Sequence, residues 1–379
     1  MSAIEPFHVM EILARAKTLE AEGRSIVHME IGEPDFPTPR PICEAGMRAL
    51  EKGALHYTPA LGLPELRERI AGFYRSRYGV GVPAERVIVT SGSSAALLLA
   101  LGVLVDPQAE VLLADPGYPA NRHFVRMFDG EPLSVPVGPD SNYQMTPALV
   151  ERHFRARTAA ALVATPSNPT GTVIPLQHVR EMADIVRARG GALLVDEIYH
   201  GLVYDGETHT ALEAGDDVFV INSFSKYFNM TGWRLGWIVA PESYVREIER
   251  LAQNVYLSAP APAQYAALAA FEPETLAILD ARREEFRARR DYLVPALRKL
   301  GFVVPHTPQG AFYVYANCAA LTDDSQRFAL DLLENAGVAI TPGLDFGTHR
   351  AGEHVRFAYT NSIERLQEGV ERIRRFIRP

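Results

Sequence analysis

The stretch Val218-Phe-Val-Ile-Asn-Ser-Phe-Ser-Lys226-Tyr-Phe-Asn-Met-Thr-Gly-Trp-Arg234 runs from four apolar residues into a lysine with aromatic neighbours. A lysine is ordinarily a solvated surface group, so this setting is unusual. Removal from water lowers the pKa of an amine, and the neutral amine is a nucleophile that forms a Schiff base with an aldehyde. Ser223 and Arg234 are anion-binding residues of the kind that hold a phosphate. A lysine beside a phosphate site suggests pyridoxal 5'-phosphate (PLP), although a buried lysine in a salt bridge is the alternative interpretation.

Apolar runs like the one at 218–221 recur through the middle of the chain and alternate with helical patterns. Four others lie at 87–89, 111–113, 161–164 and 192–195. Runs that are apolar on both faces are typical of a parallel sheet covered by helices, and the alternation indicates an α/β layer architecture. Ligands bind at the carboxyl ends of such strands. Polar side chains of this chain gather at those ends: Ser93, Tyr118, Asn168, Asp196 and Lys226.

The pattern changes after residue 272. A long helix is predicted over 272–300, and its segment 282–290 mixes charges in the manner of a solvated helix face. The first 45 residues hold a predicted helix (9–22) and strand (26–31), which we expect to pack with the C-terminal part. Further short strands are predicted at 302–304, 311–315, 338–340 and 355–359, with helices near 323–336 and 361–377. The predicted domains are a large one over 46–275 and a smaller α+β domain formed by 1–45 and 276–379.

Composition and charge narrow the class of protein. Of 379 residues, 47% are hydrophobic and 22% charged, which is typical of a globular protein with a large core. The net charge of −8 argues against nucleic acid or an anionic membrane as a partner. Cys43 and Cys318 are the only cysteines, and we find no export signal or membrane span, so we expect a cytoplasmic protein. His200 and His209 lack a third ligand nearby, so we interpret them as solvated loop residues and predict no metal site.

Three residues have the chemistry to hold the ring of PLP. Asp196 follows an apolar run, and a buried carboxylate needs a partner. The pyridine nitrogen is such a partner, because the carboxylate keeps it protonated and therefore electron-withdrawing. The Tyr199 hydroxyl and the Asn168 amide could bond the phenolic oxygen of the ring. Each also has an ordinary interpretation: Asp196 as a helix N-cap or an arginine's partner, Tyr199 as a core residue and Asn168 as a turn residue.

Three further features suit the phosphate, the ring face and the substrate. Ser93 stands where a strand meets a helix, and the free amides of a helix start bind anions; simple N-capping by Ser93 is the alternative. Tyr118 follows a strand end and could stack on the pyridine ring, with ordinary packing as the alternative. Arg356 is a charge within an apolar strand pattern. Its planar fork suits the α-carboxylate of an amino acid, unless it forms a salt bridge at a sheet edge.

Together these segments resemble the class I/II, fold-type I, PLP-dependent aminotransferases. The resemblance covers nearly the whole chain, and its pieces are weak alone but specific in their order and spacing. They are 31–39 (IGEPDFPTP), 57–62 (YTPALG), 91–94 (SGSS), 115–119 (DPGYP), 166–171 (PSNPTG), 196–199 (DEIY), the lysine segment and Arg356. The implied fold is a three-layer α-β-α large domain with a mixed, mostly parallel seven-stranded sheet, plus a smaller α+β domain.

The resemblance implies an enzyme that moves the amino group of an L-amino acid to a 2-oxo acid by a ping-pong mechanism. Lys226 is implied to carry the cofactor as an imine and to move the proton. Tyr57 is implied to reach the neighbouring subunit's site, which makes the protein a homodimer, and the Asn168–Pro169 bond is cis in some relatives. The implied cofactor-binding residues are Ser93, Ser94, Tyr118, Asn168, Asp196, Tyr199, Ser223 and Arg234, and the substrate side includes Gly32, Asn168 and Arg356.

The chain departs from the family pattern at two points. Ala95 follows Ser94 where many relatives have a glutamine, and no second arginine can be placed for a distal substrate carboxylate, so specificity for aspartate is unsupported. A PLP-dependent carbon–sulfur β-lyase or synthase on the same fold is the main alternative. A non-catalytic PLP-sensing regulator is a remote one, because the chain is acidic. A nucleotide-binding oxidoreductase lacks support, since we find no G-x-G-x-x-G motif after a strand.

Overall fold

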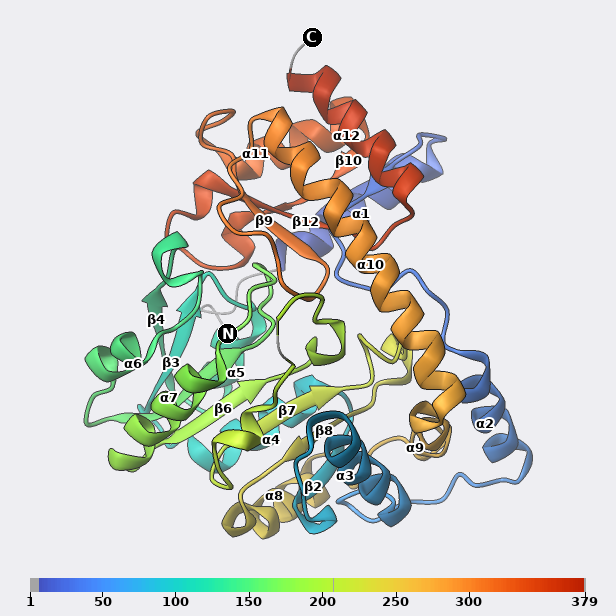
Figure 1. Cartoon of the computed structure of the whole chain (residues 1–379), viewed down its shortest axis with the longest axis vertical. Helices are drawn as coiled ribbons and strands as arrows, with labels where there is room; N and C mark the ends of the chain where they lie inside the picture. Colours follow the sequence, from blue (N-terminus) through green and yellow to red (C-terminus); the bar gives the residue numbers. More distant parts are fainter. Residues whose placement is uncertain (1–6, 207, 378–379) are drawn as a thin grey trace.

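The structure is a computed structural model that describes residues 7–206 and 208–377. Its central feature is a seven-stranded sheet with the strand order β2-β8-β7-β6-β5-β3-β4 (Figure 1). β8 runs antiparallel to both of its neighbours, and the other adjacent pairs are parallel. The mixed, mostly parallel seven-stranded sheet is therefore confirmed. Its strands are β2 (Val87–Thr90), β3 (Glu110–Asp115), β4 (Glu131–Pro136), β5 (Thr158–Ala164), β6 (Ala192–Asp196), β7 (Phe219–Ser223) and β8 (Gly236–Val239).

Helices cover both faces of this sheet, because successive strand residues point to opposite sides and both sides are apolar. Ile88 and Leu194 belong to the buried cluster on one face, and Val89 and Val195 belong to the cluster on the other. The first face is covered by α4 (Ser93–Leu104), α5 (Ala120–Met127) and α8 (Glu242–Val255). The second is covered by α3 (Pro64–Tyr78), α6 (Pro147–His153) and α7 (Leu176–Ala188). The large part of the molecule is thus a three-layer α-β-α structure.

A second, smaller group of elements contains segments from both ends of the described chain (Figure 1). β1 (Val27–His28) pairs in parallel with β10 (Val338–Ala339), so the N-terminal segment packs with the C-terminal part as expected. A three-stranded antiparallel sheet has the order β11-β12-β9. The residue bounds proposed for the two domains stay a prediction. The other elements are α1 (His8–Ala21), α2 (Arg40–Glu51), α9 (Ala261–Ala267), α10 (Pro273–Leu300), β9 (Tyr313–Asn317), α11 (Ser325–Asp331), β11 (Thr341–Pro342), β12 (His354–Ala358) and α12 (Ile363–Ile377).

Two of the smaller sequence predictions are wrong. Residues 302–304 do not form a strand, because a single bridge between Val303 and Asn317 is all that joins them to the neighbouring sheet. His200 and His209 are buried rather than solvated. His200 lies 3.2 Å from a carboxylate oxygen of Glu197, and His209 Nε2 lies 3.0 Å from the carbonyl oxygen of Ile174, so both rings have polar partners inside the protein.

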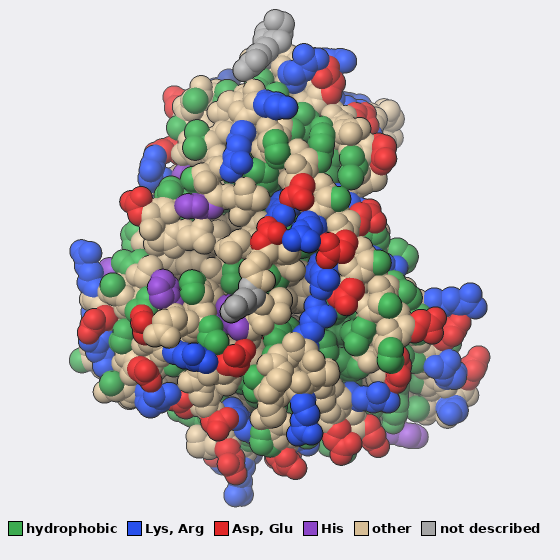
Figure 2. Space-filling model, viewed as in Figure 1, with side chains coloured by type: hydrophobic (Ala, Val, Ile, Leu, Met, Phe, Trp, Pro, Cys, Tyr) green, Lys and Arg blue, Asp and Glu red, His purple; other side chains and the backbone are tan. Residues whose placement is uncertain are grey.

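The long helix α10 is also more buried than its charge pattern suggests. Arg289 and Arg290 are 1% and 3% exposed, and they form ion pairs with Asp35 and Asp205. A buried guanidinium needs such partners, which come from distant segments and cannot be read from the helix alone. Figure 2, which has the same view as Figure 1, shows positively and negatively charged side chains close together on the surface. Within residues 7–206 and 208–377, no helix is both long and apolar enough to cross a membrane.

Candidate active site

A cavity of about 290 Å³ is lined by residues that follow the carboxyl ends of the central strands and by residues of the smaller group of elements. Polar side chains at strand ends were predicted to meet, and in the structure they do. The sequence-predicted residues on its wall are Gly32, Ser93, Ser94, Tyr118, Asn168, Asp196, Tyr199, Lys226, Arg234 and Arg356. The cavity therefore assembles residues from both ends of the chain into one candidate site.

Lys226 reaches this cavity from the loop that follows β7. Its Nζ donates a hydrogen bond of 2.6 Å to the carbonyl oxygen of Gly32. Burial lowers the pKa of Lys226 to about 8, so a substantial fraction of the amine is neutral at slightly basic pH. Among the described residues, no carboxylate lies within ion-pair distance of Nζ. The geometry therefore favours a nucleophilic amine over the alternative of a lysine held in a salt bridge.

Asp196 ends strand β6 and is 6% exposed. Burial raises the pKa of its carboxyl to about 7, and the backbone amide of Ile198 opposes this by donating to Oδ1 at 3.1 Å. In the part of the chain that the structure describes, that amide is the one hydrogen-bond donor to this carboxylate. An N–H cation placed in the cavity would restore the ionised form. Asp196 is thus suited to hold a protonated ring nitrogen.

Arg356 projects from strand β12 into the cavity and is 4% exposed. Nη1 donates to the Asn168 side-chain oxygen at 2.9 Å, and Nη2 donates to the Thr341 hydroxyl at 3.2 Å and to the carbonyl oxygen of Glu30. The guanidinium also lies 4.3 Å from the centre of the Tyr313 ring. No carboxylate of a described residue pairs with it, so the edge-strand salt bridge is not formed. A buried, fixed guanidinium without an acidic partner is suited to bind a carboxylate ligand.

An anion site is built where β2 meets α4. The N-cap residue of α4 is Gly92, with φ +87° and no side-chain cap, so Ser93 is the first helical residue and does not cap the helix. Arg234 lies against this turn, and a Cβ at Gly92 would fall 2.8 Å from its Nη2. Free helix amides, two serine hydroxyls and a guanidinium converge there. Such a set is suited to a phosphate.

Three other wall residues, Tyr118, Asn168 and Tyr199, were predicted to contact the ring of PLP. Tyr118 follows β3 and lines the cavity. Because the Asn168 side-chain oxygen accepts from Arg356, its amide nitrogen keeps its protons for another acceptor. Tyr199 is buried and its hydroxyl lies 2.9 Å from that of Tyr313. The Asn168–Pro169 bond is cis, as the resemblance suggested.

Two sequence-predicted residues, Ser223 and Tyr57, do not lie on the cavity wall, and several residues that were not predicted do. Ser223 is 1% exposed, and its Oγ lies 3.0 Å from the Oγ of Ser225, which lines the cavity in its place. Tyr57 is 83% exposed. Tyr313 is another wall residue that was not predicted. The roles given to Ser223 and Tyr57 stay predictions.

We expect Gly32→Ala to destabilise the protein, because a Cβ there would fall 2.0 Å from the Tyr313 hydroxyl. Overpacking of this kind costs about 1–3 kcal/mol. Denaturant unfolding measures the change in the free energy of unfolding. Gly72→Ala is the matched control, since a Cβ at Gly72 meets open space, and we expect it to be neutral or stabilising. Equal stability of the two variants would show that Gly32 and Tyr313 do not approach this closely.

Comparisons with known proteins agree with this geometry. A family model described as "Aminotransferase class I and II" matches residues 24–373. The chain is 38% identical to the (5-formylfuran-3-yl)methyl phosphate transaminase of Methanocaldococcus jannaschii, over 98% of this chain and 97% of that protein. It is 37% identical to the valine–pyruvate aminotransferase of Mycobacterium tuberculosis, over 98% and 96% of the two chains.

Two solved structures that resemble this chain are also aminotransferases. An aminotransferase from Mycobacterium tuberculosis superposes with a TM-score of 0.96 and 36% identity, covering 99% of this chain and 97% of the other. The aspartate aminotransferase of Thermus thermophilus with maleate has a TM-score of 0.93 and 35% identity, covering 99% and 97%.

Proposed function

Because the chain belongs to the class I and II aminotransferases, we propose that it moves an amino group between an L-amino acid with an uncharged, apolar side chain and a 2-oxo acid. Aminotransferases of this family depend on PLP, and the residues of the cavity fit that cofactor. The buried Asp196 carboxylate, the Lys226 amine and the anion site at α4 supply partners for its ring nitrogen, aldehyde and phosphate. When bound, PLP withdraws the electrons that develop at the substrate α-carbon.

The observation that carries the substrate class is the apolar part of the cavity lining. It includes the side chains of Phe7, Val9, Met10, Ile31 and Phe346. Arg234 and Arg356 are the two arginines of the described residues that line the cavity. Arg234 lies at the anion site, and a substrate α-carboxylate would occupy Arg356. Two carboxylates, Glu33 and Asp345, also line the cavity and would repel an acidic side chain. Valine, which the name of the Mycobacterium tuberculosis relative includes, has a side chain of the proposed class.

Five of the wall residues have the following proposed roles. The fork of Arg356 binds the α-carboxylate and orients the α-carbon toward Lys226. The neutral Lys226 amine would take the proton from the substrate α-carbon, hold it and return it as the general acid. Tyr199 and Asn168 donate hydrogen bonds to the cofactor's phenolic oxygen, and Tyr118 covers the ring face.

A panel of amino acids, each mixed with the PLP-bound protein without an acceptor, tests the substrate class. Amino transfer converts the cofactor to its amine form, which is followed by absorbance. We expect valine, leucine or a similar apolar amino acid to react at least about 100-fold faster than aspartate or glutamate, because a distal carboxylate would be buried without a cation. Fastest reaction with an acidic amino acid contradicts the proposed substrate class, and pyruvate and ammonia from cystathionine would instead indicate a β-lyase.

We also propose that the protein is a homodimer. At the end of α2 and in the loop after it, Met47, Leu50, Leu55 and Tyr57 are each more than half exposed. A contiguous apolar segment of this kind is typical of an interface. A second copy is its proposed occupant, with Tyr57 reaching the phosphate in the partner's cavity. Cys43 and Cys318 are free thiols, which supports a reducing, cytoplasmic location.

Tyr57→Phe is expected to weaken PLP binding about 10–100-fold, because a hydrogen bond to a charged group contributes about 1.5–3 kcal/mol. Titration of the apoprotein with PLP measures the change. Hybrid dimers of Tyr57→Phe and Lys226→Ala protomers test whether the site is shared. If Tyr57 acts across the interface, each hybrid holds one site with both Lys226 and Tyr57, and that site binds PLP with normal affinity. A hybrid whose lysine-bearing site binds as weakly as Tyr57→Phe would place Tyr57 in its own subunit's site.

A further inference from the structure

We propose that Tyr313 is a positioning residue, which donates a hydrogen bond to Tyr199 and thereby leaves the Tyr199 proton free to bond the phenolic oxygen of PLP. This inference rests on the proposed function, in which Tyr199 contacts the cofactor. Tyr313 is buried, and no role has been given to it above. The hydrogen bond also connects the substrate-binding arginine to the cofactor through the two tyrosines, Tyr313 and Tyr199.

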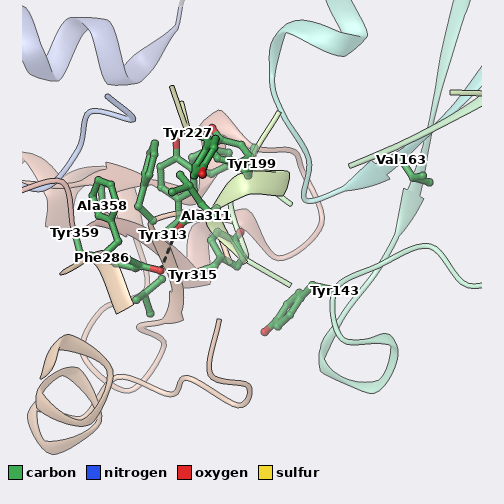
Figure 3. Packing of buried hydrophobic residues seen from close by; sticks show 14 of the residues in the cluster. Tyr143, Val163, Tyr199, Tyr227, Phe286, Ala311, Tyr313, Tyr315, Ala358 and Tyr359 are labelled. Carbon is green, nitrogen blue, oxygen red and sulfur yellow. Dashed lines mark hydrogen bonds between the residues drawn. The ribbon is translucent and has the colours of Figure 1, made fainter. Parts of the chain in front are cut away.

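The geometry of the two tyrosines is that of a fixed pair. Their hydroxyl oxygens are 2.9 Å apart, and their rings meet edge to face with centres 5.6 Å apart. Both are almost fully buried, with Tyr199 at 4% and Tyr313 at 1% exposed. Figure 3 shows them together within the cluster of buried aromatic residues. Each hydroxyl has one proton, so within the pair one donates and the other accepts.

Arg356 decides which tyrosine donates. Its guanidinium lies 4.3 Å from the centre of the Tyr313 ring, where a cation stabilises the electron-rich phenol. Burial raises the pKa of both hydroxyls, and for Tyr313 the charge of Arg356 is the largest effect that opposes this rise. Tyr313 is therefore the better acid of the pair and the better donor. Tyr199 accepts that proton and points its own into the cavity.

The fold holds these residues in register. Arg356 on β12 lies opposite Tyr315 on β9, and Tyr313 lies opposite Ala358, so Arg356 and Tyr313 are diagonal neighbours on the same face. Tyr199 follows β6 of the seven-stranded sheet and Tyr313 lies on β9 of the three-stranded sheet, so the hydrogen bond joins residues from these two sheets. Gly32 leaves the space that the Tyr313 hydroxyl fills.

Tyr313→Phe tests the proposal, because it removes the hydroxyl and keeps the ring under Arg356. The readout is the pH at the midpoint of the absorbance change of the PLP-bound enzyme. A stronger hydrogen bond to the phenolic oxygen lowers this midpoint, so its weakening is expected to raise it by about 0.5–1 pH unit. The KM for the amino acid is expected to stay within about twofold. The titratable or charged groups that act on Tyr199 are Tyr313, Arg356 and Tyr118.

Two further variants separate positioning from a merely structural role. In a Tyr199→Phe background, Tyr313→Phe is expected to cause no additional shift, because its effect passes through the missing hydroxyl. Tyr315→Phe is the matched control, since it is a buried tyrosine on the same strand, and its midpoint is expected to be unchanged. If Tyr313→Phe does not fold, Gly32→Ala displaces the same hydroxyl and is expected to raise the midpoint likewise.

The possible outcomes are distinct. A midpoint that falls in Tyr313→Phe shows that Tyr199 donates to Tyr313, and a shift of equal size in both backgrounds shows that Tyr313 acts without Tyr199; either result overturns the proposal. An unchanged midpoint overturns it as well. Failure of the wild-type protein to bind PLP or to change its absorbance with any amino acid would instead overturn the proposed function.

Discussion

Replacing Lys226 with alanine is expected to lower kcat by about 10⁴-fold or more, the upper end of what a single general base contributes. No other described amine lines the cavity, so no second lysine can take the α-proton in its place. Burial lowers the pKa of this lysine to about 8, whereas a solvated lysine would remain protonated at neutral pH. Single-turnover reaction of the PLP-bound variant with the best amino acid of the panel measures the loss.

Borohydride reduction followed by peptide mapping gives a second readout, independent of activity. The chain contains four lysines, at 17, 52, 226 and 299, so the labelled peptide identifies the residue without ambiguity. The wild-type label is expected on Lys226, and the Lys226→Ala variant is expected to carry none. Lys17→Ala removes an exposed lysine of α1 and is the control. A label on any other lysine, or full activity of the Lys226→Ala variant, would remove Lys226 from the reaction.

Asp196→Asn is expected to lower kcat by about 10²–10³-fold, because removing one partner of a buried charge pair costs about 3–5 kcal/mol. The amide keeps the shape of the side chain and loses the charge that we propose keeps the pyridine nitrogen protonated. Burial raises the pKa of the Asp196 carboxyl to about 7 when no cation faces it. In the wild-type protein, affinity for PLP is therefore expected to fall as the pH drops through 7, since the neutral carboxyl no longer attracts the ring cation.

Titration with PLP between pH 5 and pH 9 measures this dependence (a range chosen to bracket the raised pKa). The Asp196→Asn variant is expected to bind more weakly and to lack the fall below pH 7 that Asp196 causes. Asp184→Asn, at an exposed carboxylate of α7, is the matched control and is expected to behave as wild type. An unaltered pH dependence in Asp196→Asn would show that another group holds the ring nitrogen.

The sequence predicted five of the seven strands of the large sheet, because those five are apolar runs with few polar interruptions. It did not predict β4 (Glu131–Pro136), an edge strand with two prolines and several partly exposed residues, so no apolar run marks it. It also did not predict β8 (Gly236–Val239), whose four residues follow closely on the lysine segment. Edge position and antiparallel return are properties of the whole sheet, and a local pattern does not contain them.

The wall residues that were predicted are those that a local sequence pattern marks. Asp196 and Asn168 follow strand ends in sequence, so the rule that ligands bind there was enough to find them. Arg356 was found because a charge within an apolar strand is unusual. Tyr313 lies on β9 and Phe346 in the loop between β11 and β12, so neither residue follows a strand end of the large sheet that would have marked it.

The parallel pairing of β1 with β10 has a consequence for synthesis. Val27 cannot find Val338 until the ribosome has released most of the chain, which at roughly 5–20 residues per second leaves the nascent N-terminal segment waiting on the order of 15–60 s. During that interval the apolar face of α1, with Ile12 and Leu19, lacks the C-terminal elements against which it packs in the folded protein. The strands of the large sheet are all synthesised earlier, so the anion site at α4 can form before Arg356 on β12 is added to the cavity wall.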